Sequence, residues 1–89
     1  MKHVVKRKGH REKFDERKVY ASVYSAALNA HYEDPEAEKL AEKVTAKIKK
    51  WIQSRAEVTA HSISKNVMKE LNSLDEDVGL LYHSIHDLC

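Results

Sequence analysis

The chain has 89 residues, of which 42% are hydrophobic and 34% are charged, so it can form one globular domain and is too apolar for a disordered segment. Its formal net charge of +2 does not by itself indicate a nucleic-acid-binding protein. No apolar run approaches the roughly 20 residues of a membrane helix, and no signal peptide is recognisable. The lone cysteine, Cys89, allows no internal disulfide. We therefore expect a single domain over residues 1–89, in the cytoplasm and without a membrane partner.

The front of the chain predicts a short basic β-hairpin that runs directly into a helix. Residues 4–5 begin an extended segment, and the glycine of Lys8-Gly9 accepts the positive φ of a tight turn. Residues 11–14 return as the second strand. Asp15 has the side chain that helix N-termini prefer, so it predicts the start of the first helix.

Everything after Asp15 is predicted to be helical, apart from a third short strand at residues 57–59. The predicted helices are 16–30, 35–53, 60–73 and a fourth that Asp75 caps. Asp34 followed by Pro35 is a start signal for the second helix. The positions expected to face inward are Val19, Val23, Ala26, Ala27 and Ala30, then Ala37, Leu40, Ala41, Val44, Ile48, Trp51 and Ile52, then Ile63, Val67, Leu71 and Leu74, and finally Val78, Leu81, Tyr82 and Ile85. The fold class is therefore α+β but mainly α, a four-helix bundle capped by a sheet of two to three strands with an N-terminal β-hairpin.

Cations near the front are candidates for binding an anion. Lys6 and Arg7 lie on the first predicted strand, and charge-assisted bonds to phosphate are about twice as strong as neutral ones. Adjacent strand residues point to opposite faces of a sheet. Lys6 and Arg7 can therefore both reach one phosphate only if the strand twists strongly or if one of them binds through its backbone. A charged edge that prevents aggregation is the alternative. Lys18, in the first turn of the first helix, could complete an anion site or be a solvated lysine.

Glu12 and Phe14 alternate on the second predicted strand and share a face. Phe14 is expected to close the end of the bundle. Glu12 could accept a hydrogen bond from an adenine amino group, or pair with Arg7 or Arg11 across the hairpin, and spacing alone favours the pairing.

Signals for catalysis and for metal binding are weak. His83 and His86 could share a helix face, but Asp87 and Cys89 are the only further ligands nearby, and we predict no metal site. The chain has two glycines, which excludes a Walker-type or Rossmann phosphate loop, and no nucleophile–base pair is recognisable. We therefore expect a protein that is not an enzyme.

The front pattern Val4-Val5-Lys6-Arg7-x-Gly9-x-x-Glu12-x-Phe14-Asp15-x-x-Lys18-Val19 resembles the ATP-cone domain. That domain is the adenine-nucleotide sensor of many ribonucleotide reductases and of the repressor of their genes. The likeness continues through Ala41-Glu42-x-Val44 with Trp51, Val58-x-x-x-x-Ile63-x-x-x-Val67-Met68-x-x-Leu71, Leu74-Asp75 and Tyr82. The resemblance implies a four-helix bundle capped by a three-stranded sheet, with the nucleotide under the hairpin.

The resemblance also implies roles for individual residues. Phosphates would meet Lys6, Arg7 and Lys18, and the base would lie among Val4, Val5, Glu12, Phe14 and Val19. Ser64, with Ala60, occupies the positions that face the ribose in the family. The implied ligand is ATP or dATP, which Mg²⁺ could accompany, and Lys8 departs from the usual turn residue.

These observations lead us to expect a regulatory module that binds adenine nucleotides and acts through a partner chain or through self-association as a homo-oligomer. The partner would be a ribonucleotide-reductase-related or a transcriptional protein, and nucleic acid is not expected among the partners. Two alternatives stay open. One is a nucleic-acid-binding module that uses the basic N-terminal hairpin. The other is a ligand-free oligomerisation domain, suggested by Lys8, Ala60 and the sequence of residues 86–89.

Overall fold

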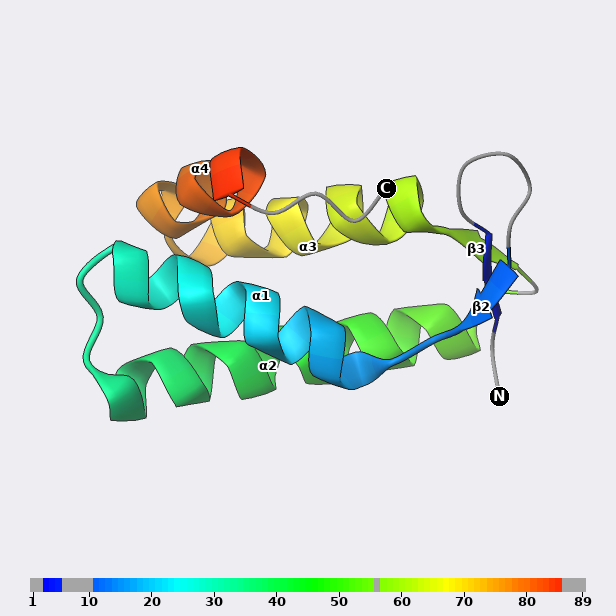
Figure 1. Cartoon of the computed structure of the whole chain (residues 1–89), viewed down its shortest axis with the longest axis horizontal. Coiled ribbons are helices and arrows are strands. Elements are labelled where there is room, and N and C mark those ends of the chain that lie inside the picture. The colour runs from blue at the N-terminus through cyan, green and yellow to red at the C-terminus, as the bar shows by residue number, and fades with distance from the viewer. Residues whose placement is uncertain (1–2, 6–10, 56, 86–89) are drawn as a thin grey trace.

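A computed structural model describes residues 3–5, 11–55 and 57–85. Its helices are α1 (Glu16–Asn29), α2 (Asp34–Gln53), α3 (Ala60–Leu74) and α4 (Glu76–Ile85). α1 lies along α2, and the short α4 packs on α3 and on α1 at the end of the bundle away from the strands (Figure 1). The predicted mainly helical architecture with four helices is confirmed.

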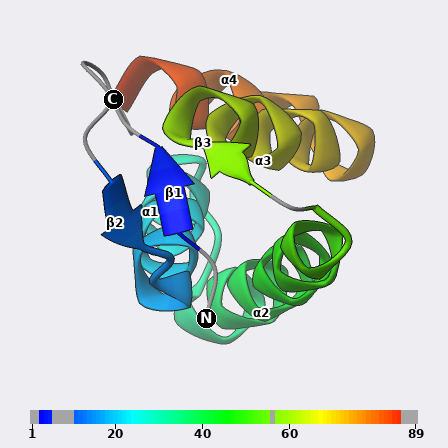
Figure 2. The same ribbon diagram turned by 90° about the vertical axis from the view of Figure 1, so that its right-hand side faces the viewer.

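Three short strands lie at the other end of the bundle: β1 (His3–Val5), β2 (Arg11–Lys13) and β3 (Val58–Thr59). β1 is central, antiparallel to β2 and parallel to β3, as Figure 2 shows from the sheet side. Val4 is opposite Glu12 on one side and Val58 on the other. The predicted turn at residues 8–9 lies outside the described residues. Because β2 leads into α1 and β3 into α3, the sheet holds the starts of these two helices near each other.

The core confirms most of the predicted inward positions. The buried ones are Val19, Val23, Ala26, Ala27, Ala37, Ala41, Val44, Ile48, Ile52, Ile63, Val67, Leu71, Val78 and Tyr82. The prediction for Leu74 is wrong, since its exposed fraction is 38%. Leu74 is the last residue of α3, so it continues the apolar spacing of that helix at a position where the helix no longer packs against its neighbours. Ser22 and Thr45 are buried polar residues that apolar spacing could not indicate.

The helix starts show where capping rules hold and where they do not. Asp15 caps α1, because its carboxylate accepts a hydrogen bond from the Arg17 backbone N–H at 3.0 Å. Asp75 likewise accepts from the Asp77 N–H at 3.0 Å at the start of α4. The predicted cap at Asp34 is wrong: Glu33 occupies the N-cap position without a side-chain cap bond. The Asp34 carboxylate instead accepts the Tyr24 hydroxyl at 3.0 Å, an interaction between α1 and α2 that local sequence does not reveal.

The turn between α1 and α2 is tied to the α3–α4 junction. His31 has φ 70°, and the Tyr32 N–H donates to the Ala27 carbonyl at 3.0 Å, which closes the end of α1. The Tyr32 hydroxyl then donates to the Asp75 carboxylate at 2.5 Å. Because Asp75 also caps α4, one side chain joins two turns that are 43 residues apart.

Candidate functional site

The candidate site lies at the sheet end of the bundle, where the N-terminal halves of α1 and α3 meet the strands (Figures 1 and 2). Phe14 follows β2 and is half-buried against the core. Lys18 is exposed in the first turn of α1, and Ser64 is half-buried in the second turn of α3. An aromatic ring, a cation and a hydroxyl therefore come from three separate segments to one end of the molecule.

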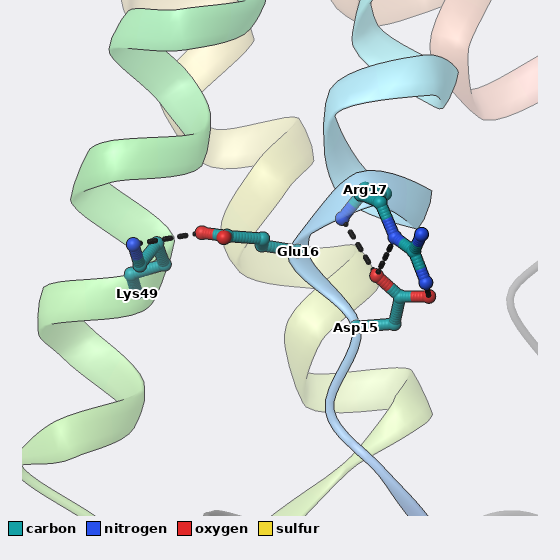
Figure 3. A network of polar contacts seen from close by, with 4 residues as sticks. All are labelled: Asp15, Glu16, Arg17 and Lys49. Carbon is teal, nitrogen blue, oxygen red and sulfur yellow. Dashed lines mark hydrogen bonds and ion pairs between the residues drawn. The ribbon is translucent and has the colours of Figure 1, made fainter.

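The start of α1, which carries Lys18, is held by polar contacts on two sides. The Arg17 guanidinium donates to both carboxylate oxygens of Asp15, with Nε and Nη2 each at 3.1 Å (Figure 3). These bonds lower the pKa of Asp15, so the cap is ionised at neutral pH. On the other side Glu16 forms an ion pair with Lys49 of α2 at 2.8 Å, which links α1 to the last turns of α2.

Inside the bundle, three hydroxyl groups gather behind the site. Tyr82 of α4 is 1% exposed, and Ser22 of α1 is 6% exposed. Burial raises the pKa of Tyr82, and the nearby hydroxyls of Ser22 and Ser64 oppose that rise. Ser22 comes one helical turn after Lys18, so the two side chains project from one side of α1. These three hydroxyls come from α1, α3 and α4 and lie in the interior of the bundle.

Sequence reasoning placed Tyr82 only in the apolar core and did not identify Ser22. The available signal was weak: Ser22 is a polar residue four positions after Lys18 on an otherwise Ala- and Val-rich helix. The Ser22 hydroxyl also donates to the Val19 carbonyl at 2.9 Å. Such a local bond is enough to explain a buried serine on an apolar helix without any role in a site.

The structure gives the predicted site residues unequal support. It brings Val4, Phe14, Lys18, Val19 and Ser64 to the sheet end, with Val4 and Val19 buried in the same apolar cluster. Val5 and Glu12 are placed by backbone pairing alone: Val5 is opposite Arg11 and Thr59, and Glu12 is opposite Val4. Lys6 and Arg7 lie outside the described residues, as do Lys8 and residues 86–89. The roles of all these residues toward a ligand stay predictions.

Within the described residues, no three His, Cys, Asp or Glu side chains gather in a way that could hold a metal ion. Of the pair considered above, His86 lies outside that part of the chain, and His83 is placed only as part of α4. None of the helices there has the length and apolar character needed to cross a membrane.

A shallow pocket of about 310 Å³ lies elsewhere, between α1 and α2. Its lining residues are Glu16, Arg17, Tyr20, Glu42, Thr45, Ala46 and Lys49. None of the residues predicted to bind a nucleotide lines it. The pocket is therefore distinct from the candidate site.

Comparisons with known proteins identify the family of this chain. Residues 2–87 match the family model of the ATP cone domain. The chain is 29% identical over 83 residues to a transcriptional repressor NrdR of Dictyoglomus thermophilum, and 28% identical over 83 residues to the NrdR of Dictyoglomus turgidum. Each alignment covers 93% of this chain and 54% of the relative, so the chain spans about half the length of these curated relatives. Because these relatives are transcriptional repressors, they do not support the expectation that nucleic acid is absent from the partners. The match over nearly all residues, together with the mainly helical structure, shows that the chain belongs to the ATP-cone family, whose domains bind ATP or dATP as regulatory ligands.

Proposed function

We propose that this chain is a regulatory module that binds an adenine nucleotide at the sheet end of the bundle and does not catalyse a reaction on it. The observation that carries the proposal is the position of Lys18. It projects from a helix start that Asp15 caps and that the Glu16–Lys49 ion pair holds, at the same end as Phe14 and Ser64. A positioned cation beside an aromatic ring and a hydroxyl offers one partner each for phosphate, base and ribose.

In the proposed complex, β1, β2 and the segment between them form a hairpin over the nucleotide. Lys6, Arg7 and Lys18 contact the phosphates, and a Mg²⁺ ion can accompany the triphosphate. The base lies among Val4, Val5, Glu12, Phe14 and Val19, while Ser64 faces the ribose. The buried positions of Val4 and Val19 suit an apolar backing for the base.

The proposed output is a change in association. Binding favours one of two states of a surface that meets a partner chain or a second copy, because a ligand shifts an equilibrium only by its differential affinity for the two states. The NrdR relatives are named transcriptional repressors, which favours a transcriptional partner, and we expect the module to act in the cytoplasm. The strands and α1 are the elements that can transmit the change, because they connect the proposed hairpin to the bundle.

Calorimetry with ATP, dATP and GTP tests the proposal. We expect binding of the adenine nucleotides and an increase in melting temperature, since millimolar ligand stabilises the chain even when the affinity is modest. Lys18→Ala should weaken binding roughly 10- to 100-fold, the usual range for one charged hydrogen bond. Lys69→Ala, an exposed lysine on α3, is the matched control and should leave the affinity unchanged.

Two outcomes would contradict this function. Neither heat nor thermal stabilisation at millimolar ATP and dATP would show that the site is empty in solution. Phosphate release from ATP that is lost in Lys18→Ala and retained in Lys69→Ala would show that the chain is an enzyme and not only a sensor.

A further inference from the structure

The charges on α2 are sorted into separate rows. Lys39, Lys43, Lys47 and Lys50 are all exposed, and we call them the lysine row. At 100° per residue they fall within an arc of about 80°, opposite the buried side of the helix, and they span about 16 Å along its axis. Glu36, which is also exposed, falls within this arc near the start of α2, and from Lys39 onward the arc carries only lysines.

Two acidic residues of the same helix, Glu38 and Glu42, lie toward a different neighbour. Desolvation raises the pKa of the Tyr20 phenol on α1, and the nearby charges of Glu38 and Glu42 add to that rise. Lys49, which does not belong to the row, also points toward α1 and pairs with Glu16. Opposite charges spaced four residues apart stabilise a helix, and like charges at that spacing destabilise it. The sequence of α2 nevertheless places Lys39, Lys43 and Lys47 in succession at that spacing.

Most of the row is not neutralised by the chain. Lys47 pairs with Glu70 of α3 at 3.2 Å, and its side chain is still 50% exposed. Among the described residues, no ion pair joins Lys39, Lys43 or Lys50 to an acid. A row of closely spaced cations with so little compensation is suited to an anionic partner that also carries regularly spaced charges.

We propose that the lysine row of α2 contacts the phosphate backbone of duplex DNA without reading its sequence. Lysines on one side of a helix match a regular polyanion, and backbone contacts of this kind position a protein without base recognition. A lipid surface does not fit, because membrane-bound helices need apolar side chains beside their cations, and the apolar side of α2 is buried. Because the NrdR relatives are named transcriptional repressors, DNA is favoured over RNA as the polyanion.

Salt-dependent binding to a duplex of about 30 base pairs tests this inference, with fluorescence anisotropy as the readout. Four phosphate contacts predict that affinity falls about 150-fold between about 50 and 200 mM salt. Lys43→Gln/Lys50→Gln leaves two contacts, so the fall should be about 12-fold over the same range. The matched control is Lys65→Gln/Lys69→Gln, which removes the same net charge from exposed positions on α3 and should keep the wild-type salt dependence.

Several results would overturn the lysine row as a DNA contact. The first is the absence of wild-type binding to DNA at about 50 mM salt, and the second is an equal loss of DNA affinity in the two double variants. Tighter binding to duplex RNA would also overturn it. Equally strong competition by polyglutamate would point to an acidic protein as the partner. Calorimetry with ATP on Lys43→Gln/Lys50→Gln separates this inference from the proposed function. Nucleotide heat retained with DNA binding lost supports the row, and DNA binding retained fully in this variant contradicts it.

Discussion

The hydrogen bond between Tyr32 and Asp75 should make a measurable contribution to stability, because it is the polar link between the α1–α2 turn and the α3–α4 junction. The phenol donates to an ionised carboxylate at 2.5 Å, and both residues are half-buried. Bonds to charged acceptors contribute about 1.5–3 kcal/mol when buried, and partial exposure reduces this to about 1 kcal/mol here. Tyr32→Phe should therefore lower the melting temperature by about 4–8 °C in a chain of this size.

A double-mutant cycle in chemical denaturation isolates that bond. Asp75→Ser keeps a good N-cap residue for α4 and removes the carboxylate that reaches Tyr32. We expect Tyr32→Phe to cost about 1 kcal/mol in the wild-type background and close to nothing beside Asp75→Ser. If the two substitutions are additive, the bond does not couple the turns and the reasoning is refuted.

The same pair predicts how stability depends on pH. The hydrogen bond from Tyr32 lowers the pKa of Asp75 below its ordinary 3.8, so this stabilisation is present above about pH 4 and is lost as the pH falls through the folded-state pKa. The bond to Asp75 also raises the pKa of Tyr32 to about 12, so its contribution is present below pH 10 and is lost as the pH rises toward 12. The coupling energy should therefore be constant near neutrality and smaller at about pH 2. A coupling that grows in acid would contradict this assignment.

Two further predictions concern buried positions. Thr45→Val should raise the free energy of unfolding by about 1 kcal/mol, because the Thr45 hydroxyl is buried without a hydrogen-bond partner among the described residues. Thr59→Val is the control and should lower the free energy of unfolding by about 1 kcal/mol, since Thr59 caps α3. A loss of stability in both variants would show that the Thr45 hydroxyl has a partner. Gly79→Ala should destabilise the chain, because its Cβ would lie 2.0 Å from the Asn72 Oδ1 and 3.2 Å from the Asn72 backbone N. In an Asn72→Ala background the side-chain clash is gone and only the 3.2 Å approach to the backbone N remains, so the same substitution should cost less; equal losses of melting temperature in both backgrounds would contradict the packing argument.

The sequence alone was sufficient for the helices, because their signals are local. Apolar residues at three- and four-residue spacing predicted the buried side of every helix, and Asp15 and Asp75 marked two helix starts by their own capping chemistry. The same kind of signal failed where a distant residue intervened. Asp34 had the right chemistry for a cap, but in the folded chain it accepts a bond from Tyr24.

The candidate site was predictable only in part. A pattern at the front of the chain identified Lys18 and Phe14, and the structure places Phe14 directly after β2 and Lys18 in the first turn of α1. The contribution of Ser22 and Tyr82 depended on how α1, α3 and α4 pack, since residues 22, 64 and 82 share no spacing along the chain.

The sequence by itself thus determined the number of helices, their buried sides and the family pattern at the front, because each depends on residues within a few turns of one another. Only the tertiary structure decided which polar groups meet: the Tyr32–Asp75 bond, the hydroxyls behind the candidate site, and the separation of the lysine row from Glu38 and Glu42. The physical reason is that hydrogen bonds and ion pairs form over about 3 Å. The packing of the helices determines which side chains come within that distance, and residue spacing along one helix does not specify it.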